Sequence, residues 1–234
     1  MGRAFWLEDS VLRDLVPLPR YASLCLKYRP YGQDPRRAYT MIPRRAYIAN
    51  LMAAARVRSI PGCVVECGVW RGGMIAGIAE VLGDSRAYHL FDSFEGLPTA
   101  EEIDGPAAVA YQADKTSPRY LDNCRAEEGL AMQAMKMSGV SNFHLHKGWF
   151  SDTLPHFQPE TPIALLRLDG DWYESTMTCL TNLWDHLAPG AIVLVDDYYT
   201  WDGCSRAVHR FLADRQATAR IDRMFGYVAA IRTS

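Results

Sequence analysis

Short apolar runs alternate with segments of helical periodicity over most of the chain. Several of these runs are apolar at nearly every position, which is typical of parallel strands that are covered on both faces. The runs span residues 63–69, 87–91, 142–146, 163–168, 191–195 and 227–231. Apolar residues at helical spacing predict a helix over residues 175–187, which Pro189-Gly190 ends. This alternation predicts an α/β fold with a doubly wound, mostly parallel sheet.

Two segments depart from the alternation. The runs 219–225 and 227–231 are separated by one glycine, and so tight a connection predicts an antiparallel pair at the sheet edge. The connection from Pro98 to Val140 is longer than a crossover helix over residues 125–137 requires. The remainder predicts an inserted loop, and we expect residues 99–119 to close over a binding site as a lid.

Residues 1–60 form an arm that is rich in Pro, Arg and Tyr, with a helix predicted over residues 44–58. We expect this arm to belong to the same domain as residues 61–234. It carries eleven Arg/Lys and four Asp/Glu, which indicates a solvated arm or, alternatively, a surface for an anionic partner. Its aromatic residues could form a dimer contact, and we expect a homo-oligomer.

Composition narrows the possible environment and partners. The net charge of the 234 residues is −2, which argues against nucleic-acid binding, and no apolar run approaches the ~20 residues of a membrane span. Glu8, Asp9 and Arg13 interrupt any signal-peptide core. None of the six cysteines forms a CxxC pair. We therefore expect a cytoplasmic protein without structural disulfides, zinc, membrane contact or nucleic-acid partner.

The segment VVECGVWRGGMIAGIAEVLG predicts a strand, a Gly-rich turn and a helix. Its spacing is neither GxGxxG nor a phosphate loop, which disfavours an NAD(P) oxidoreductase. Glu66 ends this strand and Asp92 ends the next, where an acid can accept both ribose hydroxyls. An acid beside the turn favours a cationic ligand over a pyrophosphate. S-adenosylmethionine, which has a ribose, an ammonium and a sulfonium but no phosphate, fits these requirements.

Four carboxylates follow two later strands: Asp169 and Asp171 after one, Asp196 and Asp197 after the next. If the strands are neighbours, these like charges meet at the carboxyl edge of the sheet and need a cation among them. Oxygen ligands without His or Cys favour Mg²⁺ over Zn²⁺. The alternative interpretation is that some of these aspartates cap helices or turns.

Four ordered segments, VVECGVWRGG, LFDSFEGLP, LRLDGDWYES and VLVDDYYTWDGCSRAV, resemble the macrocin O-methyltransferase family (TylF/MycF/NovP-like) over roughly residues 40–232. Members of this family are class I S-adenosylmethionine-dependent enzymes that require Mg²⁺ and methylate sugar hydroxyls on natural products. The resemblance implies that Asp171 is the catalytic base and that Asp169, Asp196 and Asp197 bind Mg²⁺. The residues that it assigns to the methyl donor are Glu66, Gly68, Asp92, Ser93, Gly148, Trp149 and Phe150.

The leading hypothesis is thus a Mg²⁺-dependent O-methyltransferase whose acceptor is a sugar or a glycosylated small molecule. A catechol-type acceptor is an alternative, because any vicinal diol can chelate the metal. A non-catalytic S-adenosylmethionine-binding regulator is a third hypothesis, which the retained cluster of four aspartates disfavours.

Overall fold

The computed structural model of the protein describes residues 18–31, 37–117 and 120–232. Glu8, Asp9 and Arg13 lie outside these residues. Among the helices of the described ranges, none is long and apolar enough to cross a membrane. All six cysteines are free thiols, and five of them are buried.

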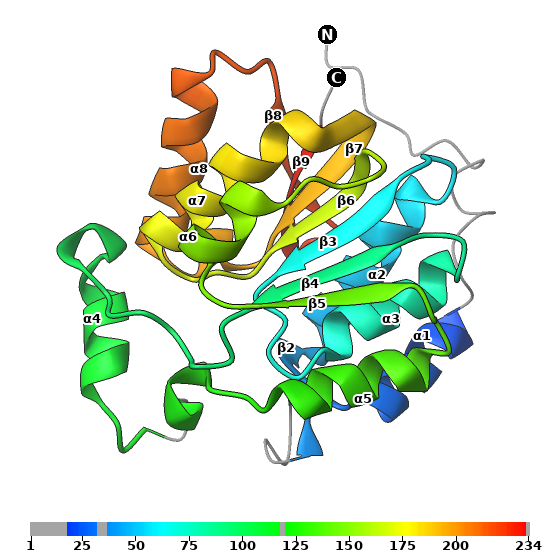
Figure 1. Ribbon diagram of the computed structural model, residues 1–234. Helices are drawn as coiled ribbons and strands as arrows, with labels where there is room; N and C mark the ends of the chain where they lie inside the picture. Colours follow the sequence, from blue (N-terminus) through cyan, green and yellow to red (C-terminus); the bar gives the residue numbers. More distant parts are fainter. Residues whose placement is uncertain (1–17, 32–36, 118–119, 233–234) are drawn as a thin grey trace, which may run out of the picture.

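The main sheet has seven strands, which Figure 1 shows side by side. They are β3 (Cys63–Cys67), β4 (Tyr88–Asp92), β5 (Phe143–Lys147), β6 (Ile163–Leu168), β7 (Leu187–Val195), β8 (Arg220–Met224) and β9 (Val228–Arg232). Their order is β5-β4-β3-β6-β7-β9-β8. The strands from β5 to β7 run parallel, whereas β9 is antiparallel to both of its neighbours. The predicted mostly parallel sheet with an antiparallel edge pair is confirmed.

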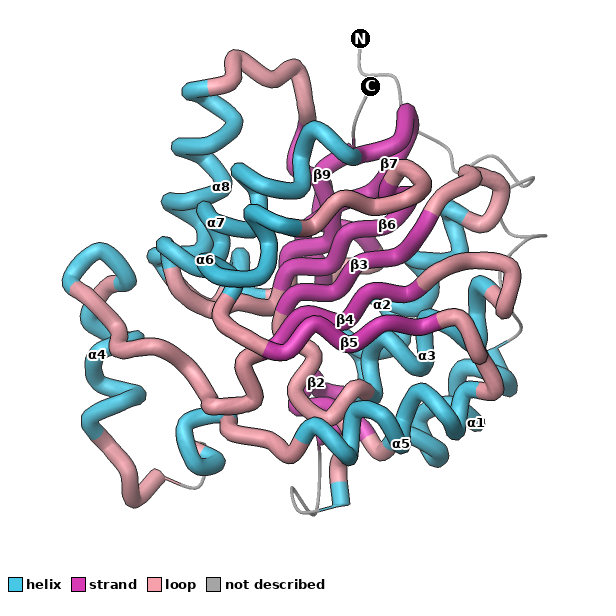
Figure 2. Tube along the Cα trace, in the orientation of Figure 1, coloured by secondary structure: helices cyan, strands magenta, loops and turns pink. Residues whose placement is uncertain are grey.

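Helices cover both faces of this sheet (Figure 2). One face carries α1 (Leu18–Tyr28), α2 (Arg44–Ala54), α3 (Gly73–Leu82) and α5 (Glu128–Ser138), and the other carries α6 (Phe150–Thr153), α7 (Tyr173–Leu183) and α8 (Asp202–Asp214). The helix α4 (Pro106–Ala113) lies apart from the sheet, within the long connection between β4 and α5. A separate two-stranded parallel sheet consists of β1 (Pro30–Tyr31) and β2 (Thr40–Pro43).

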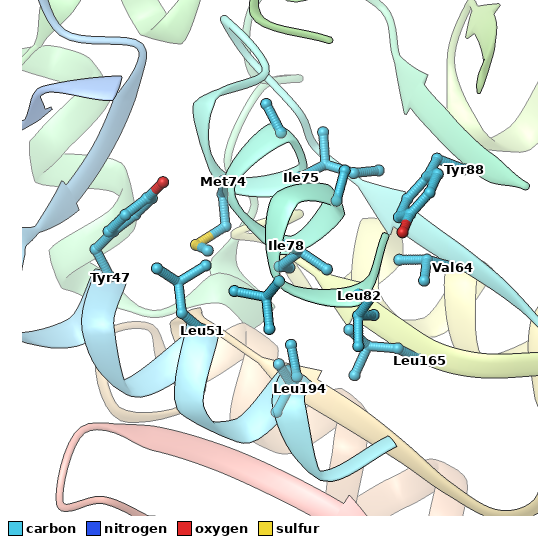
Figure 3. Close-up of a cluster of buried hydrophobic side chains, with 14 of the residues drawn as sticks. Tyr47, Leu51, Val64, Met74, Ile75, Ile78, Leu82, Tyr88, Leu165 and Leu194 are labelled. Carbon is cyan, nitrogen blue, oxygen red and sulfur yellow. The ribbon is translucent and has the colours of Figure 1, made fainter. Parts of the chain in front are cut away.

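The sheet divides the hydrophobic core in two. Successive residues of a strand point to opposite faces, so Val64 packs on one side and Val65 on the other. Val64 belongs to a cluster with Leu51 of α2 and Ile75 of α3, which Figure 3 shows in close-up. Val65 belongs to the second cluster, with Leu180 of α7. Burial on both faces explains why these strands are nearly continuous apolar runs.

Two predicted elements were wrong. The predicted helix over residues 175–187 ends earlier, because α7 stops at Leu183 and a short 3₁₀ turn, Trp184–His186, leads directly into β7. Pro189 and Gly190 therefore lie within β7, where the pairing with β6 is irregular and Gly190 has a φ of 77°. The connection after Pro98, predicted as a loop, contains α4, which begins with a proline at its first turn.

Candidate active site

A cavity of about 280 Å³ lies at the carboxyl edge of the sheet. The chain runs outward from β3 through β4 to β5 and then returns to the other side of β3 with β6, so the strand order reverses there. Ligands of open α/β sheets bind at such a reversal. The ends of four strands line the cavity, with Gly68 after β3, Asp92 at the end of β4, Gly148 after β5 and Asp169 after β6.

Gly68 allows the ends of β3 and β6 to approach each other. Its φ is +86°, and a Cβ atom at this position would lie 1.8 Å from the carbonyl oxygen of Asp169. The backbone N–H of Asp169 also donates to the carbonyl of Cys67 at 2.8 Å. No side chain fits into so close a contact between two backbones, which explains the glycine that follows this strand.

Asp92 joins the end of β4 to the glycine-rich turn. Its Oδ2 accepts the backbone N–H groups of Val69 at 2.9 Å and Trp70 at 2.8 Å, and its Oδ1 accepts that of Phe94 at 2.7 Å. Burial raises the pKa of Asp92, whereas these three N–H groups lower it. Asp92 thus holds the turn in shape while its carboxylate lines the cavity.

The other residues predicted to hold the methyl donor divide into two groups. Ser93, Gly148, Trp149 and Phe150 all line the cavity together with Gly68 and Asp92. Glu66 does not line it: its side chain is 1% exposed and lies within the sheet. The nearest charged partner of Glu66 is Arg167, whose Nη1 lies 2.6 Å from Oε1.

Arg167 is a fully buried cation behind the site. Besides Glu66, its guanidinium contacts Asp169 Oδ2 at 2.9 Å and Asp196 Oδ1 at 2.7 Å. Burial raises the pKa of Glu66 to about 7 and that of Asp196 to about 6, and the charge of Arg167 opposes both shifts. One cation therefore faces three carboxylates, which leaves the site with excess negative charge when all three are ionised.

A second group of carboxylates lies on the other side of Asp169. One oxygen each of Asp169, Asp171 and Asp197 lie within 4.8 Å of one another, which is close enough to share one cation. Asp196 is not in this group, and its Oδ1 faces Arg167 instead. Of the three predicted metal ligands, the structure brings Asp169 and Asp197 together, and it adds Asp171, the predicted base.

The electrostatics of this group favour a bound cation. Burial, and then the charge of Asp169, raise the pKa of Asp171 to about 8, while a hydrogen bond from Trp201 lowers it. Burial and the charges of Asp171 and Asp169 raise the pKa of Asp197 well above its usual value. A divalent cation would relieve this repulsion, and three carboxylate oxygens are the donors that Mg²⁺ prefers.

Asp171 has an uncommon backbone conformation, with a φ of 57°. Asp tolerates the left-handed region better than most residues. Its backbone N–H donates to Asp197 Oδ2 at 3.1 Å, and its Oδ1 accepts the indole N–H of Trp201 at 2.9 Å. The turn after β6 is therefore tied to the segment after β7 through both the backbone and the side chain of Asp171.

The insertion after β4 is docked against α7 and α8, the two helices beside the site. The Oδ1 of Asp104 accepts the backbone N–H of Tyr173 in α7 at 2.7 Å. The indole N–H of Trp172 donates to the carbonyl of Pro98 at 2.9 Å. At the base of the insertion, Asn123 Nδ2 donates to the carbonyl of Leu97 at 2.7 Å. These bonds hold one end of the insertion at the cavity, which Leu97 and Pro98 line.

Sequence reasoning missed several residues that matter at this site. Arg167 carries a signal in retrospect, because it is the one charge in an otherwise apolar strand and a buried charge requires partners. Further lining residues carry no such signal, since they come from separate loops and helices: Met41, Leu97, Pro98, Cys124, Glu174, Ser175 and Thr178.

Comparisons with known proteins agree with this arrangement. A family model described as macrocin-O-methyltransferase (TylF) matches residues 20–232. A demethyldecarbamoylnovobiocin O-methyltransferase of Streptomyces niveus is 36% identical over 197 residues, which cover 79% of this chain and 72% of the relative. The 8-demethyl-8-(2,3-dimethoxy-alpha-L-rhamnosyl)-tetracenomycin-C 4'-O-methyltransferase of Streptomyces olivaceus is 35% identical over 201 residues, which cover 78% of this chain and 71% of the relative.

Solved structures extend the likeness to the fold. The O-methyltransferase NovP has a TM-score of 0.71 and 28% identity, and the match covers 84% of this chain and 83% of that one. The calicheamicin methyltransferase CalS11 has a TM-score of 0.63 at 21% identity over 99% of both chains, which shows a shared fold.

Proposed function

This chain belongs to the macrocin O-methyltransferase family, and we propose that it methylates a hydroxyl of a sugar on a glycosylated natural product, in antibiotic or related secondary metabolism. As an O-methyltransferase it uses S-adenosylmethionine. Two of its relatives are named for methyl transfer to a novobiocin precursor and to a rhamnosyl tetracenomycin. The observation that carries the proposal is that Asp169 and Asp171 line the same cavity as all of the predicted donor residues except Glu66.

The predicted donor residues are suited to S-adenosylmethionine in three ways. Gly68 leaves the backbone open for close approach, and Asp92 with Ser93 offers oxygens to a ribose. Trp149 and Phe150 supply apolar area for an adenine ring. Glu66 does not line the cavity, and its effect on the site is indirect, through its ion pair with Arg167.

Mg²⁺ is the second proposed cofactor. Its predicted ligands Asp169 and Asp197 lie in the group of oxygens that fits a divalent cation, and Asp171, the proposed base, lies beside them. When bound, the ion supplies a Lewis acid that lowers the pKa of a hydroxyl held beside it. Asp196, predicted as a third ligand, lies outside this group and pairs with Arg167 through Oδ1.

Within this arrangement Asp171 has the role of general base. A sugar hydroxyl is a poor nucleophile at neutral pH, so its proton must be removed as the methyl group is transferred. The hydrogen bond from Trp201 engages Oδ1 of Asp171, which leaves Oδ2 as the oxygen that accepts this proton. Burial raises the pKa of this carboxyl group, and a cation held by Asp169 and Asp197 would oppose that shift and keep the carboxylate ionised for its role as base.

Methyl transfer from a labelled donor to a panel of natural-product glycosides and catechols, with and without Mg²⁺, tests the proposal. We expect transfer to glycosides that carry a vicinal diol, and we expect chelation of the metal to abolish it. Transfer to catechols alone would replace the acceptor class. Saturable donor binding without transfer to any acceptor would favour a non-catalytic regulator.

A further inference from the structure

Trp201 connects two members of the carboxylate group. It is half-buried and immediately precedes α8. Its backbone N–H donates to the carbonyl of Asp197 at 2.9 Å, and its indole N–H donates to Asp171 Oδ1 at the same distance. The residue is thus fixed by the backbone of one member of the carboxylate group and holds the side chain of another.

The indole is an unusual partner for a carboxylate that exchanges protons. The indole donates one hydrogen bond, accepts none and does not titrate. It therefore can neither accept a proton from Asp171 nor transfer one to it. It orients the carboxylate without entering the chemistry. Since Oδ1 is engaged in this way, the rotation of the Asp171 side chain is restricted and the same oxygen is left free in each catalytic cycle.

The ring that carries this N–H is itself held by aromatic neighbours. Its centroid lies 5.2 Å from that of Trp172 at an interplanar angle of 68°, and 5.6 Å from that of Tyr111 at 58°. Tyr111 belongs to α4 in the insertion, and its hydroxyl donates to the carbonyl of Tyr120. The insertion therefore supplies part of the aromatic packing around Trp201. The orientation of Asp171 depends on that segment for this reason.

We propose that Trp201 is a positioning residue for methyl transfer, which orients the Asp171 carboxylate toward the acceptor hydroxyl through its indole N–H. This inference rests on the proposed function, in which Asp171 is the general base. It assigns a role to a residue that is not among those that line the cavity: Trp201 acts on the rate of the chemical step and not on binding.

The test removes the N–H and leaves the ring in place. β-(3-Benzothienyl)alanine, in which sulfur replaces the indole N–H, is incorporated at position 201, and 5-fluorotryptophan, which keeps the N–H, is the conservative rescue. Trp201→Phe is the genetically encoded counterpart. We expect the benzothienyl protein and Trp201→Phe to lose roughly tenfold to a hundredfold in kcat, with the acceptor KM and the Kd of S-adenosylhomocysteine unchanged. The fluorotryptophan protein should keep its kcat.

Trp184→Phe is the matched control, because it makes the same replacement in a ring that packs against Phe211 and lies just before β7, at the end of that strand opposite the carboxylates. Its kcat should stay close to that of the parent. A loss of kcat in Trp184→Phe as large as in Trp201→Phe, or a normal kcat in the benzothienyl protein, would overturn the inference.

A double-mutant cycle separates this inference from the proposed function. In an Asp171→Asn background, the change at Trp201 should cause no further loss, because the group that it orients is gone. A further loss there would show that Trp201 acts elsewhere. If Asp171→Asn turns over normally, the proposed base is wrong. If Asp171→Asn is inactive while the benzothienyl protein is fully active, only the role of Trp201 fails.

Discussion

Arg167 is the residue that holds the negative charge of the site together. It is fully buried and contacts Glu66, Asp169 and Asp196, so its loss would leave up to three carboxylates near one another without a cation. Such a cluster of carboxylates is stable only with the cation of Arg167 present, because a buried charge without a partner has lost its hydration and has no ion pair to compensate for that loss. The same arrangement keeps Asp196 away from the group formed by Asp169, Asp171 and Asp197.

Replacing this cation gives the first prediction. Arg167→Met replaces the charged guanidinium with an unbranched, apolar side chain. We expect this change to lower the free energy of unfolding by about 3–5 kcal/mol. Arg210→Met is the control, because it removes an arginine whose partner Asp214 lies on the solvent-exposed surface of α8. It should leave stability nearly unchanged. Urea unfolding of both variants measures the difference, and equal stabilities would contradict the role of Arg167.

A second prediction separates the two aspartates that follow β7. Asp197→Asn should weaken Mg²⁺ binding more than Asp196→Asn, because Asp197 lies in the oxygen group and Asp196 is paired with Arg167. For Asp196→Asn we expect a loss of about tenfold, the lower end of the range that is typical of a residue outside the coordination shell. Calorimetric titration with Mg²⁺ measures both. Equal losses would mean that Asp196 leaves Arg167 and binds the metal.

The proposed base gives the third prediction. Asp171→Asn should lower turnover by roughly 10²–10⁴-fold, the range for removal of a general base, while the Kd of S-adenosylhomocysteine is kept. Asn is the best replacement because it also tolerates the left-handed conformation of this position. The measurement is kcat at saturating Mg²⁺. Normal turnover would assign proton removal to another group.

At the scale of elements, the central strands β3 and β6 were predictable because every one of their residues is buried, so each reads as a nearly continuous apolar run. The run at 163–168 coincides with β6. The end of α7 and the start of β7 were not predictable, because a Pro-Gly pair marks irregularities inside strands as well as the ends of helices, and here it lies inside β7. The helix α4 was missed because its short Ala-rich segment buries only Ala108 and shows no clear amphipathic period.

The site was predictable to the extent that strand ends meet at one edge. Gly68, Asp92, Asp169 and Asp171 line one cavity as the order of strands requires. The direction in which each carboxylate turns was not predictable, because it depends on partners far away in the sequence. Glu66 and Asp196 turn toward Arg167.

The docking of the insertion gives the fourth prediction. Gly203 at the start of α8 has no room for a side chain: a Cβ atom would lie 2.3 Å from Asp104 Oδ1 and 3.0 Å from the backbone nitrogen of Tyr173. Gly203→Ala should therefore loosen the insertion at a cost of about 1–3 kcal/mol. Faster proteolytic cleavage within residues 99–117 and a raised acceptor KM are the expected results.

Gly129→Ala is the matched control, since nothing lies within 4 Å of a Cβ atom at that position in α5. It should leave the cleavage rate unchanged. Equal cleavage of Gly203→Ala and the parent would mean that these contacts do not hold the insertion. The same assay, run with and without donor and acceptor, tests the prediction that the segment closes as a lid over the bound substrates.

At the scale of the whole molecule, the carboxylate group links stability to pH and to the metal. The pKa of Asp171 is raised to about 8 in the folded protein, whereas an unfolded chain releases this proton near pH 4. Between these values the folded state holds a proton that the unfolded state has lost. The metal-free protein therefore loses stability as the pH rises from about 4 to about 8. The raised pKa of Asp197 adds to the same trend.

Mg²⁺ should reverse this loss, which is the fifth prediction. The ion binds ionised carboxylates, so it competes with protons and stabilises the folded state more as the pH rises. At a hundredfold excess over its Kd it should contribute about 2.7 kcal/mol at pH 8, or a rise in Tm of roughly 5–10 °C for a chain of this length. At pH 5.5 the same concentration should raise the Tm less. Thermal unfolding at matched ionic strength measures both increments, and Asp197→Asn, which lacks one of the oxygens, should reduce the increment at pH 8. An increment that is equal at the two pH values would show that the cation binds away from these aspartates, because only binding that displaces protons depends on pH in this direction.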